Sequence, residues 1–290
     1  MRERTKPFDP RQVMLRPDFE IFHTQDTKLK AVEVHHHDFY EVYFLLRGRV
    51  TYRIEGRIYH PQPGDLLLIS PMELHQVTVE GEDEPYERMV LWIGRAYLDG
   101  FAREEETLSR CFDRSYPGHS NLLHLPEAQL SQVRRLLERL SWERQGQEYA
   151  AELCAQGLLL QLMAFLNRAD HAGSQGEETA LISQVLDYIN AHYAEEITLD
   201  HLAQKFYVSK YHLSHEFSRV VGSGVYRYIL LKRLLMAREL LMLATPPGEV
   251  ALRCGFQEYS NFYRAFRTHY GASPRSYLAQ GCKHSDAGLA

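Results

Sequence analysis

Histidine residues cluster near the start of the chain, close to an acidic residue. His35 and His37 are two positions apart, and Glu41 follows four residues after His37. On a strand, side chains two residues apart point to the same face, so the two imidazoles would share one face. Imidazole and carboxylate groups bind divalent metal ions, and they also hydrogen-bond small polar molecules. The cluster therefore predicts the wall of a binding site, for either a metal or an organic ligand.

The surrounding segment, residues 19–92, has the pattern of short antiparallel strands. Val50, Tyr52 and Ile54 alternate with polar residues, and turns such as Pro61-Gln-Pro-Gly64-Asp65 separate the apolar runs. Alternation with closely spaced turns predicts an antiparallel sandwich or a small barrel. The other strands are expected at residues 40–46, 66–69, 77–79 and 89–93.

The apolar period becomes helical between Pro126 and Arg168. The first stripe is Leu130, Val133, Leu136, Leu137 and Leu140, and the second is Leu153, Leu158, Leu159, Leu162, Met163 and Leu166. Two such helices can cover the barrel or face a second subunit, and both uses stay open. A polar stretch with two glycines follows, which predicts a linker.

The C-terminal third contains an internal repeat of helical segments. The spacing of Phe217, Gly222 and Tyr228 is the same as that of Phe266, Gly271 and Tyr277. The repeat period is 48–49 residues, which is 48 between Ala203 and Ala251 and 49 between the phenylalanines. Two similar units of this size predict two helix-turn-helix modules. Residues 225–243 between them predict a helix of nearly 30 Å, at about 1.5 Å per residue. Such a helix could hold two recognition helices about one DNA turn apart.

Individual positions in the repeat have physical roles. Gly255 lies in the turn of the second module, where a positive φ costs little only for glycine. In the first module Tyr207 or its neighbour takes that place, so we expect a different turn there. Ser209 is expected to cap the following helix. Gly222 and Gly271 are expected to end the helices that precede them.

Composition and charge set the broad class of protein. The 290 residues are 44% hydrophobic and 24% charged, which is typical of a soluble globular chain of one or two domains. No apolar run reaches the roughly 18 residues of a membrane helix, and the N-terminus has no export signal. The four cysteines are far apart and indicate free thiols in a reducing cytoplasm. Motifs for nucleophilic or phosphate-binding sites, such as GxSxG, Walker A and GxGxxG, are absent.

The charge is distributed unevenly along the chain. The net charge is −5, yet residues 180–281 contain 11 Lys and Arg against 8 Asp and Glu, whereas residues 1–179 contain 21 against 29. A mildly basic third on an acidic body favours a nucleic-acid-binding part joined to something else.

The C-terminal residues carry a specific resemblance. Gly255-Phe256, Ser260-Asn-Phe262-Tyr-Arg-Ala-Phe266-Arg and Gly271-Ala-Ser-Pro274-Arg-Ser-Tyr277 resemble the C-terminal signature of the AraC/XylS family of bacterial transcription regulators. Leu202-Ala203 and Ser209-Lys-Tyr-His-Leu213-Ser-His-Glu-Phe217 resemble that family's first helix-turn-helix. Pro246-Pro247 and Glu258-Tyr259 depart from the family pattern, which concerns the entry to the second module and not the fold.

The N-terminal histidines carry a second resemblance. His35-His-His37-Asp-Phe-Tyr-Glu41 with Gly48 resembles the first motif of cupin barrels, and Pro63-Gly64-Asp65 with Ser70-Pro-Met-Glu-Leu-His75 resembles a degraded second motif. AraC-family sensor domains of the sugar-responsive kind commonly look like this. The candidate effector-binding residues are His35, His37, Glu41, Tyr43, His75 and Trp92. The metal ligands that the resemblance implies are His35, His37, Glu41 and His75, although AraC-like proteins often keep the motif without a metal.

The N-terminal residues of a recognition helix reach base edges in the major groove. The candidate DNA-binding residues are Ser209, Lys210, Tyr211, His212, His215 and Arg219 in the first module and Glu258, Tyr259, Asn261, Arg264 and Arg267 in the second. Arg264 suits guanine and Asn261 suits adenine. Arg219 and Arg267 suit phosphates.

The sequence thus predicts an α+β fold with two domains: an N-terminal antiparallel cupin-like β-barrel with following helices, and a C-terminal all-α double helix-turn-helix. We expect an effector-binding and dimerisation domain over residues 1–168, a linker over 169–178, a DNA-binding domain over 179–281 and a tail over 282–290.

The expected function is that of a cytoplasmic transcription regulator, an activator and not an enzyme, which binds double-stranded DNA under the control of a small effector such as a sugar. The expected partners also include RNA polymerase and a second copy of the chain, and no membrane. The alternatives are a metal-dependent cupin enzyme with a helical appendage and an interaction scaffold. The doubled helix-turn-helix argues against the enzyme, and salt-dependent DNA affinity would exclude the scaffold.

Overall fold

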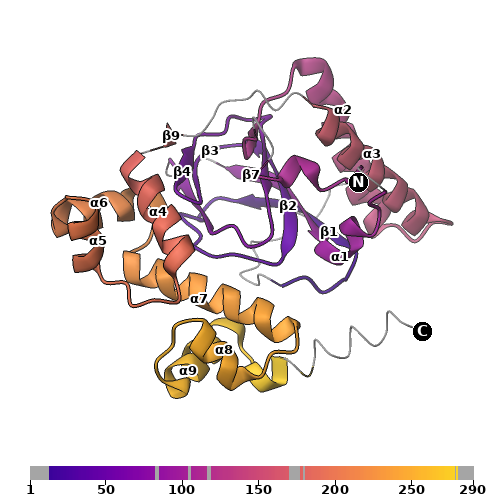
Figure 1. Ribbon diagram of the computed structural model, residues 1–290. Coiled ribbons are helices and arrows are strands. Elements are labelled where there is room, and N and C mark those ends of the chain that lie inside the picture. The colour runs from indigo at the N-terminus through magenta and orange to yellow at the C-terminus, as the bar shows by residue number, and fades with distance from the viewer. Residues whose placement is uncertain are drawn as a thin grey trace. The chain divides into compact units, whose positions relative to one another are not determined.

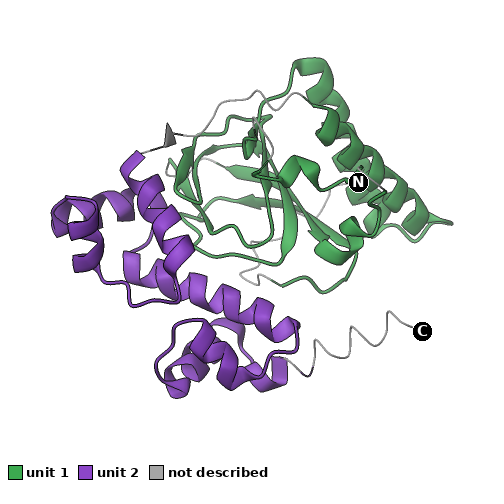
Figure 2. Cartoon of the chain, in the orientation of Figure 1, with its two compact units in different colours: residues 1–178 green, residues 179–290 purple. Residues whose placement is uncertain are grey.

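The computed structural model describes residues 13–81, 85–103, 106–115, 119–169, 177–178, 180–277 and 279. The chain divides into two compact units, residues 1–178 and residues 179–290 (Figures 1 and 2). Residues 170–176, which make up most of the predicted linker, and the predicted tail at 282–290 lie outside the described residues. No helix in the described ranges is long and apolar enough to cross a lipid bilayer.

The N-terminal unit is built on two antiparallel sheets (Figure 1). The first has the strand order β1-β7-β2-β5-β8 and the second has the order β6-β3-β4-β9. The strands are β1 Phe19–Asp26, β2 Phe39–Arg47, β3 Arg49–Ile54, β4 Arg57–Tyr59, β5 Leu66–Ile69, β6 His75–Glu80, β7 Tyr86–Gly94, β8 Leu122–Leu123 and β9 Glu177–Glu178. The last strand occupies the end of the predicted linker, where Glu178 pairs with Arg57 of β4. The antiparallel barrel that the alternation predicted is confirmed.

The first sheet is buried on both faces. Along β2, Tyr43 and Leu45 pack between the two sheets, whereas Val42 and Phe44 face the helices. Those helices are α1 Arg95–Asp99, α2 Glu127–Gln145 and α3 Ala151–Arg168, and a short 3-10 turn spans Arg110–Phe112. Figure 1 shows α2 and α3 running side by side next to this sheet.

The apolar stripes of α2 and α3 belong to the same core as the outer face of the first sheet. Val133, Leu137, Leu159 and Leu162 are fully buried there. The helices therefore cover the barrel, which was one of the two uses that the sequence left open. Leu153 is an exception, because 70% of it is exposed and it was wrongly assigned to the buried stripe.

The C-terminal unit consists of helices and contains the predicted repeat. The helices are α4 Ala180–His192, α5 Leu199–Lys205, α6 Lys210–Val221, α7 Val225–Met242, α8 Pro247–Arg253 and α9 Tyr259–Tyr270. Each helix-turn-helix buries an i,i+4 pair from its second helix, which is Leu213 with Phe217 in α6 and Phe262 with Phe266 in α9. Ser209 caps α6 through its hydroxyl, and Gly222 and Gly271 end α6 and α9 in the left-handed conformation.

Helix α7 belongs to the cores of both helix-turn-helix modules. Its Tyr228 packs edge-on against Phe217 of α6, with 5.6 Å between the ring centroids. Its Leu234, Ala237 and Leu241 share a core cluster with Phe262 and Phe266 of α9. Buried residues therefore occur around most of this helix rather than along one stripe.

The turn of the first module has the same hydrogen-bond pattern as the turn of the second. Tyr207 has φ +53°, and its amide donates to the carbonyl of Gln204, while the amide of Val208 donates to Ala203. Gly255 has φ +76° and Phe256 bonds to Ala251 in the same way. The expectation of a different turn is therefore wrong. Tyr207 tolerates the left-handed conformation because its side chain is 96% exposed and meets no backbone.

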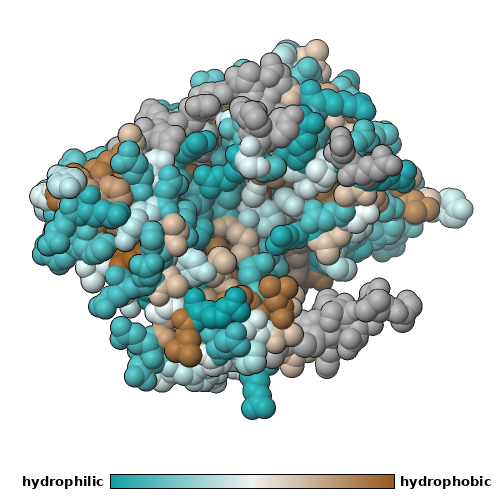
Figure 3. Space-filling model, viewed as in Figure 1, coloured by the Kyte–Doolittle hydropathy of each residue, from teal (hydrophilic) through white to brown (hydrophobic). Residues whose placement is uncertain are grey.

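Apolar side chains on the surface are scattered rather than continuous. On the face that Figure 3 shows, brown residues form small separate patches among hydrophilic ones. Scattered apolar residues of this kind are normal for a globular surface and need no functional explanation.

Candidate functional site

Four of the candidate barrel residues come together between the two sheets. His35 and His75 form a backbone bridge, with N–O distances of 3.0 and 2.9 Å, so the two sequence motifs meet at this point. The rings of His37 and His75 are 4.8 Å apart between centroids. Glu41 of β2 lies 3.4 Å from Nε2 of His37 through its Oε2 atom. We call His35, His37, Glu41 and His75, together with Trp92, the histidine cluster.

Each imidazole of the histidine cluster is held by a backbone carbonyl. The Nδ1 atoms of His35, His37 and His75 lie 2.8, 2.9 and 2.8 Å from the carbonyl oxygens of Glu33, Phe39 and Glu73 respectively. Since a carbonyl can only accept, each Nδ1 carries the proton and donates it. In a neutral ring held in this way, Nε2 is the free acceptor.

Burial and charge both favour the neutral form of His75. Its pKa is well below the ordinary histidine value because burial penalises the charged ring, and His35 and His37 add to that effect. Trp92 of β7 donates from Nε1 to Glu41 Oε2 at 2.8 Å, so an indole and a carboxylate extend the polar wall. The cluster therefore combines imidazole, indole and carboxylate groups in one buried wall.

The donor atoms fit a divalent metal in part. Donor atoms of His37, Glu41 and His75 all lie within 4.8 Å of one another, and all three residues are buried. Imidazole nitrogens with one carboxylate are a donor set for Zn²⁺, Fe²⁺, Ni²⁺ or Mn²⁺. Backbone carbonyls that orient metal-ligating histidines through the other ring nitrogen are common around such ions. His35 is not a member of that group of donors, although its ring lies 4.2 Å from that of His75.

Tyr43 belongs to a second polar group inside the barrel. Its hydroxyl donates to that of Tyr86 at 3.1 Å, and Tyr52 packs beside it with 4.9 Å between ring centroids. Arg88 lies over the ring of Tyr86 at 4.1 Å and donates to Asp26 at 2.7 Å. Burial raises the pKa of Tyr86 to about 12, so the phenol keeps its proton.

The sequence reasoning missed Arg88 and Tyr86 as interior residues, whereas Tyr52 belongs to the alternating apolar set that it did place inside. Arg88 and Trp92 are four positions apart on β7 and therefore share a face of that strand. This alternation was the available signal, since it places Arg88 on the same side as a residue already assigned to the barrel interior. A buried arginine also needs an acidic partner, which Asp26 supplies from β1.

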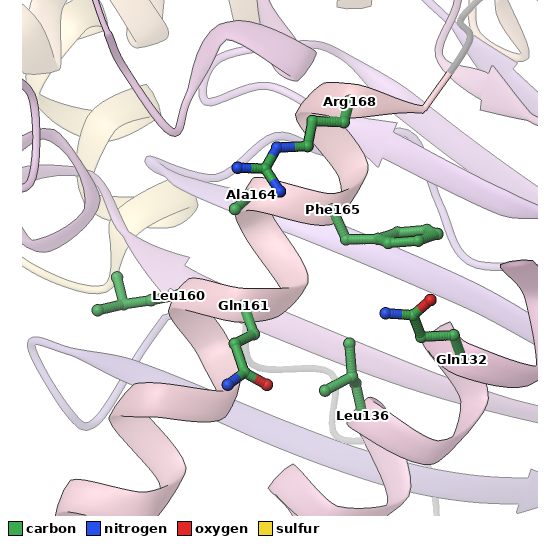
Figure 4. Close-up of a pocket in the computed structure, with 7 residues that line it drawn as sticks. All are labelled: Gln132, Leu136, Leu160, Gln161, Ala164, Phe165 and Arg168. Carbon is green, nitrogen blue, oxygen red and sulfur yellow. The ribbon is translucent and has the colours of Figure 1, made fainter.

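A shallow groove runs between α2 and α3 at the edge of their buried stripes. Leu136, Leu160 and Phe165 supply its apolar part, while Gln132, Gln161 and Arg168 supply polar groups around them (Figure 4). The remaining lining residue is Ala164. Such a surface is mixed in character and has room for the side chains of another helix.

The first recognition helix, α6, presents the predicted residues to solvent. Lys210, Tyr211, His212 and His215 are exposed near its start, and Arg219 is exposed one turn further on. Ser209 accepts a hydrogen bond from the amide of His212, so its hydroxyl is engaged as a cap. All of these residues are therefore exposed, and Tyr211, His215 and Arg219, which are four positions apart in turn, share one face of the helix.

The second recognition helix, α9, begins after Glu258, the N-cap residue. Tyr259, Asn261, Arg264 and Arg267 are exposed. Arg264 donates to Oδ1 of Asn261 at 2.7 Å, so the two side chains support each other's orientation.

These observations define a class of protein. The chain combines two helix-turn-helix modules with an antiparallel barrel that has a polar interior, which is the organisation of a ligand-binding transcription regulator. Family comparisons agree with this class. The AraC-like ligand-binding domain matches residues 17–163, half of the chain, and a helix-turn-helix domain matches residues 202–280. The chain belongs to the AraC family of transcription regulators.

Individual relatives are more distant. The HTH-type transcriptional activator RhaS of Salmonella arizonae is 27% identical over 252 residues, which cover 87% of this chain and 88% of RhaS. The C-terminal domain of AraT, a response regulator from Geobacillus stearothermophilus, is 28% identical over 35% of this chain and 86% of that one, with a TM-score of 0.34. Wild-type ToxT from Vibrio cholerae with an unsaturated fatty acid bound is 13% identical over 91% of this chain and 95% of that one, with a TM-score of 0.41.

Proposed function

We propose that the chain is a sequence-specific DNA-binding regulator whose DNA binding is controlled by a small polar molecule held in the N-terminal barrel. The observation that carries this proposal is the buried histidine cluster on the same chain as two exposed recognition helices. A ligand that binds one arrangement of the chain more tightly than another shifts the population toward that arrangement.

The effector site is formed by the histidine cluster and by Tyr43. Neutral imidazoles, an indole N–H, a phenol and one carboxylate bind hydroxyl groups well, because together they supply both donors and acceptors. A sugar or a similar polyhydroxy compound fits this chemistry. We assign no catalytic role to these residues.

The DNA contacts are made by α6 and α9. Arg264 suits the O6 and N7 atoms of guanine, and Asn261 suits the N6 and N7 atoms of adenine. Arg219 and Arg267 lie further along their helices and suit phosphates. Lys210, Tyr211, His212, His215 and Tyr259 complete the proposed contacts, and Ser209 and Glu258 mark the start of the two helices.

The regulator acts in the cytoplasm as a homodimer that activates transcription. The groove between α2 and α3 supports dimerisation, because its apolar centre and amide rim suit a matching helix pair from a second copy. RhaS is named a transcriptional activator, which supports activation by this chain. RNA polymerase is the partner that we propose for an activator of this kind.

A second candidate function is metal binding in the barrel. It is favoured by the three Nδ1 atoms that are fixed on carbonyls, which orient Nε2 as a ligand. His37, Glu41 and His75 would hold a divalent ion, with His35 beside them. Such an ion would supply a Lewis-acid contact for effector oxygens.

The deciding experiment measures binding of the full chain to its own upstream DNA over a salt series, with the metal content of the same sample assayed. We expect tight binding that weakens steeply with salt, and a loss of at least about 1 kcal/mol in Arg264→Ala. Arg139→Ala is the control, because it removes an exposed arginine from α2 in the other unit. The metal-dependent cupin enzyme would be favoured instead by three results together: undetectable DNA binding at low salt, one tightly held metal per chain, and turnover of a small substrate.

A further inference from the structure

The two helix-turn-helix modules differ strongly in charge. Residues 180–224, which hold the first module, contain three Lys and Arg against five Asp and Glu. Residues 225–281, which hold α7 and the second module, contain eight against three. The net charge is thus −2 for residues 180–224 and +5 for residues 225–281. Of that +5, the shared helix α7 carries +3 and residues 243–281 carry +2, although the backbones of the two modules repeat each other.

The cations of the first module have local partners. Lys210 forms an ion pair with Asp200 of α5. Arg219 donates to Glu216 Oε2 at 2.8 Å, one turn back on α6. Lys205 lies 4.3 Å from the ring centroid of Tyr188. The two exposed ion pairs contribute little stability, but Lys210 and Arg219 each bring a carboxylate to any phosphate that they approach.

The cations of the second recognition helix are differently placed. Arg264 is hydrogen-bonded to the neutral side chain of Asn261. Within the described ranges, neither Arg264 nor Arg267 has a carboxylate partner. Both are exposed on α9, so their full charge faces a bound polyanion.

We propose that the two modules bind DNA by different means: the second module supplies most of the electrostatic affinity, and the first supplies sequence discrimination with little affinity of its own. This inference rests on the proposed function. Phosphate affinity depends on the counterions that protein cations displace, and a cation with an adjacent carboxylate displaces few. The first module then reads bases through the exposed side chains of Tyr211, His212 and His215.

The test compares two double variants that each remove two positive charges. The full-length variants are Arg264→Gln/Arg267→Gln and Lys210→Gln/Arg219→Gln. Each is titrated with a duplex of about 40 base pairs, roughly four turns, from the upstream region. We expect the first pair to lower the slope of log K against log salt by at least about 0.9, because Arg267 supplies one phosphate contact, while the loss of Arg264 from guanine lowers the affinity further. The second pair should lower it by less than about 0.5.

The reciprocal variant tests the cause. Asp200→Asn/Glu216→Gln removes the carboxylates beside Lys210 and Arg219, so it should steepen the salt dependence and raise affinity. His212→Ala should weaken binding to the upstream duplex and leave binding to a scrambled duplex unchanged. Circular dichroism melting checks that each variant is folded.

Equal changes of slope in the two double variants, or no steepening in Asp200→Asn/Glu216→Gln, would overturn this inference and leave the proposed function standing. If the wild-type chain binds neither duplex in a salt-dependent way, the proposed function fails as well. The two failures are therefore distinct.

Discussion

Replacing Gly255 by alanine should destabilise the C-terminal unit more than any other glycine-to-alanine change in that unit. Gly255 has φ +76°, and a Cβ atom built there lies 2.3 Å from the carbonyl oxygen of Ala194 and 2.8 Å from its Cα. Real Cβ atoms do not approach backbone so closely, so the segment between α4 and α5 must move. The left-handed conformation costs about 1–2 kcal/mol for alanine, and the displaced packing costs about 1–3 kcal/mol more.

A matched control separates those two costs. Gly271 has nearly the same φ, +71°, but a Cβ there meets nothing within 4 Å. Gly271→Ala should therefore lose only the conformational part, about 1–2 kcal/mol, whereas Gly255→Ala should lose about 2–5 kcal/mol. Tyr207→Gly, at the matching place in the first module, should be stabilising or neutral because Tyr207 already bears the left-handed φ.

The assay can follow the two units of the intact chain separately. Both tryptophans, Trp92 and Trp142, lie in the N-terminal unit, so their fluorescence reports on that unit alone. The C-terminal unit contributes much of the helical circular dichroism signal. In urea, Gly255→Ala should move the dichroism transition and leave the fluorescence transition in place. The reasoning is refuted if Gly255→Ala and Gly271→Ala have equal free energies of unfolding, or if the fluorescence transition shifts too.

Three further outcomes follow from single side chains. Cys254 is fully buried, and burial raises its pKa to about 11, so its thiol should react slowly. After iodoacetamide treatment of the native chain at pH 8, peptide mapping should find exposed Cys154 modified and Cys254 protected. Equal rates of modification would contradict this. Trp92→Phe leaves buried Glu41 without its indole donor, so it should lower the free energy of unfolding of the N-terminal unit by about 1–3 kcal/mol. The measurement is circular dichroism in urea, and Trp142→Phe is the exposed control. Phe266→Ala leaves a cavity at a fully buried position in the second module and should lower the free energy of unfolding by about 3–5 kcal/mol. Leu252→Ala, at an exposed position, is the control, and a smaller decrease for Phe266→Ala than for this control would contradict the buried packing of Phe266.

Local patterns were sufficient to predict most of the fold. Residues 66–69 form a strand with the predicted bounds because an apolar run lies between a Pro-Gly-Asp turn and a Ser-Pro turn. The two helix-turn-helix modules were predictable because the repeat preserves the residues that pack, cap and terminate each helix. The histidine cluster was located through the spacing of two motifs, and its geometry agrees with that expectation for His37, Glu41 and His75.

The rest depends on partners that are distant in sequence. Arg88 is interior only because Asp26 and Tyr86 meet it across neighbouring strands. Arg233 is half-buried and donates to the carbonyls of Tyr193 and Glu195 at 2.7 Å each, and no local pattern around Arg233 indicates these partners. Burial lowers its pKa, and its role is to fix α7 to the end of α4.

The dual burial of α7 limits how the C-terminal unit can be divided or recombined. A fragment that ends after α6 would expose the core face of Phe217, and one that begins at α8 would expose Phe262 and Phe266, because in each case the apolar partner lies on α7. Both modules therefore need α7 in the same chain to keep their cores buried. New DNA specificity is more readily obtained by changing exposed residues of α6 or α9 than by grafting a whole module from a relative.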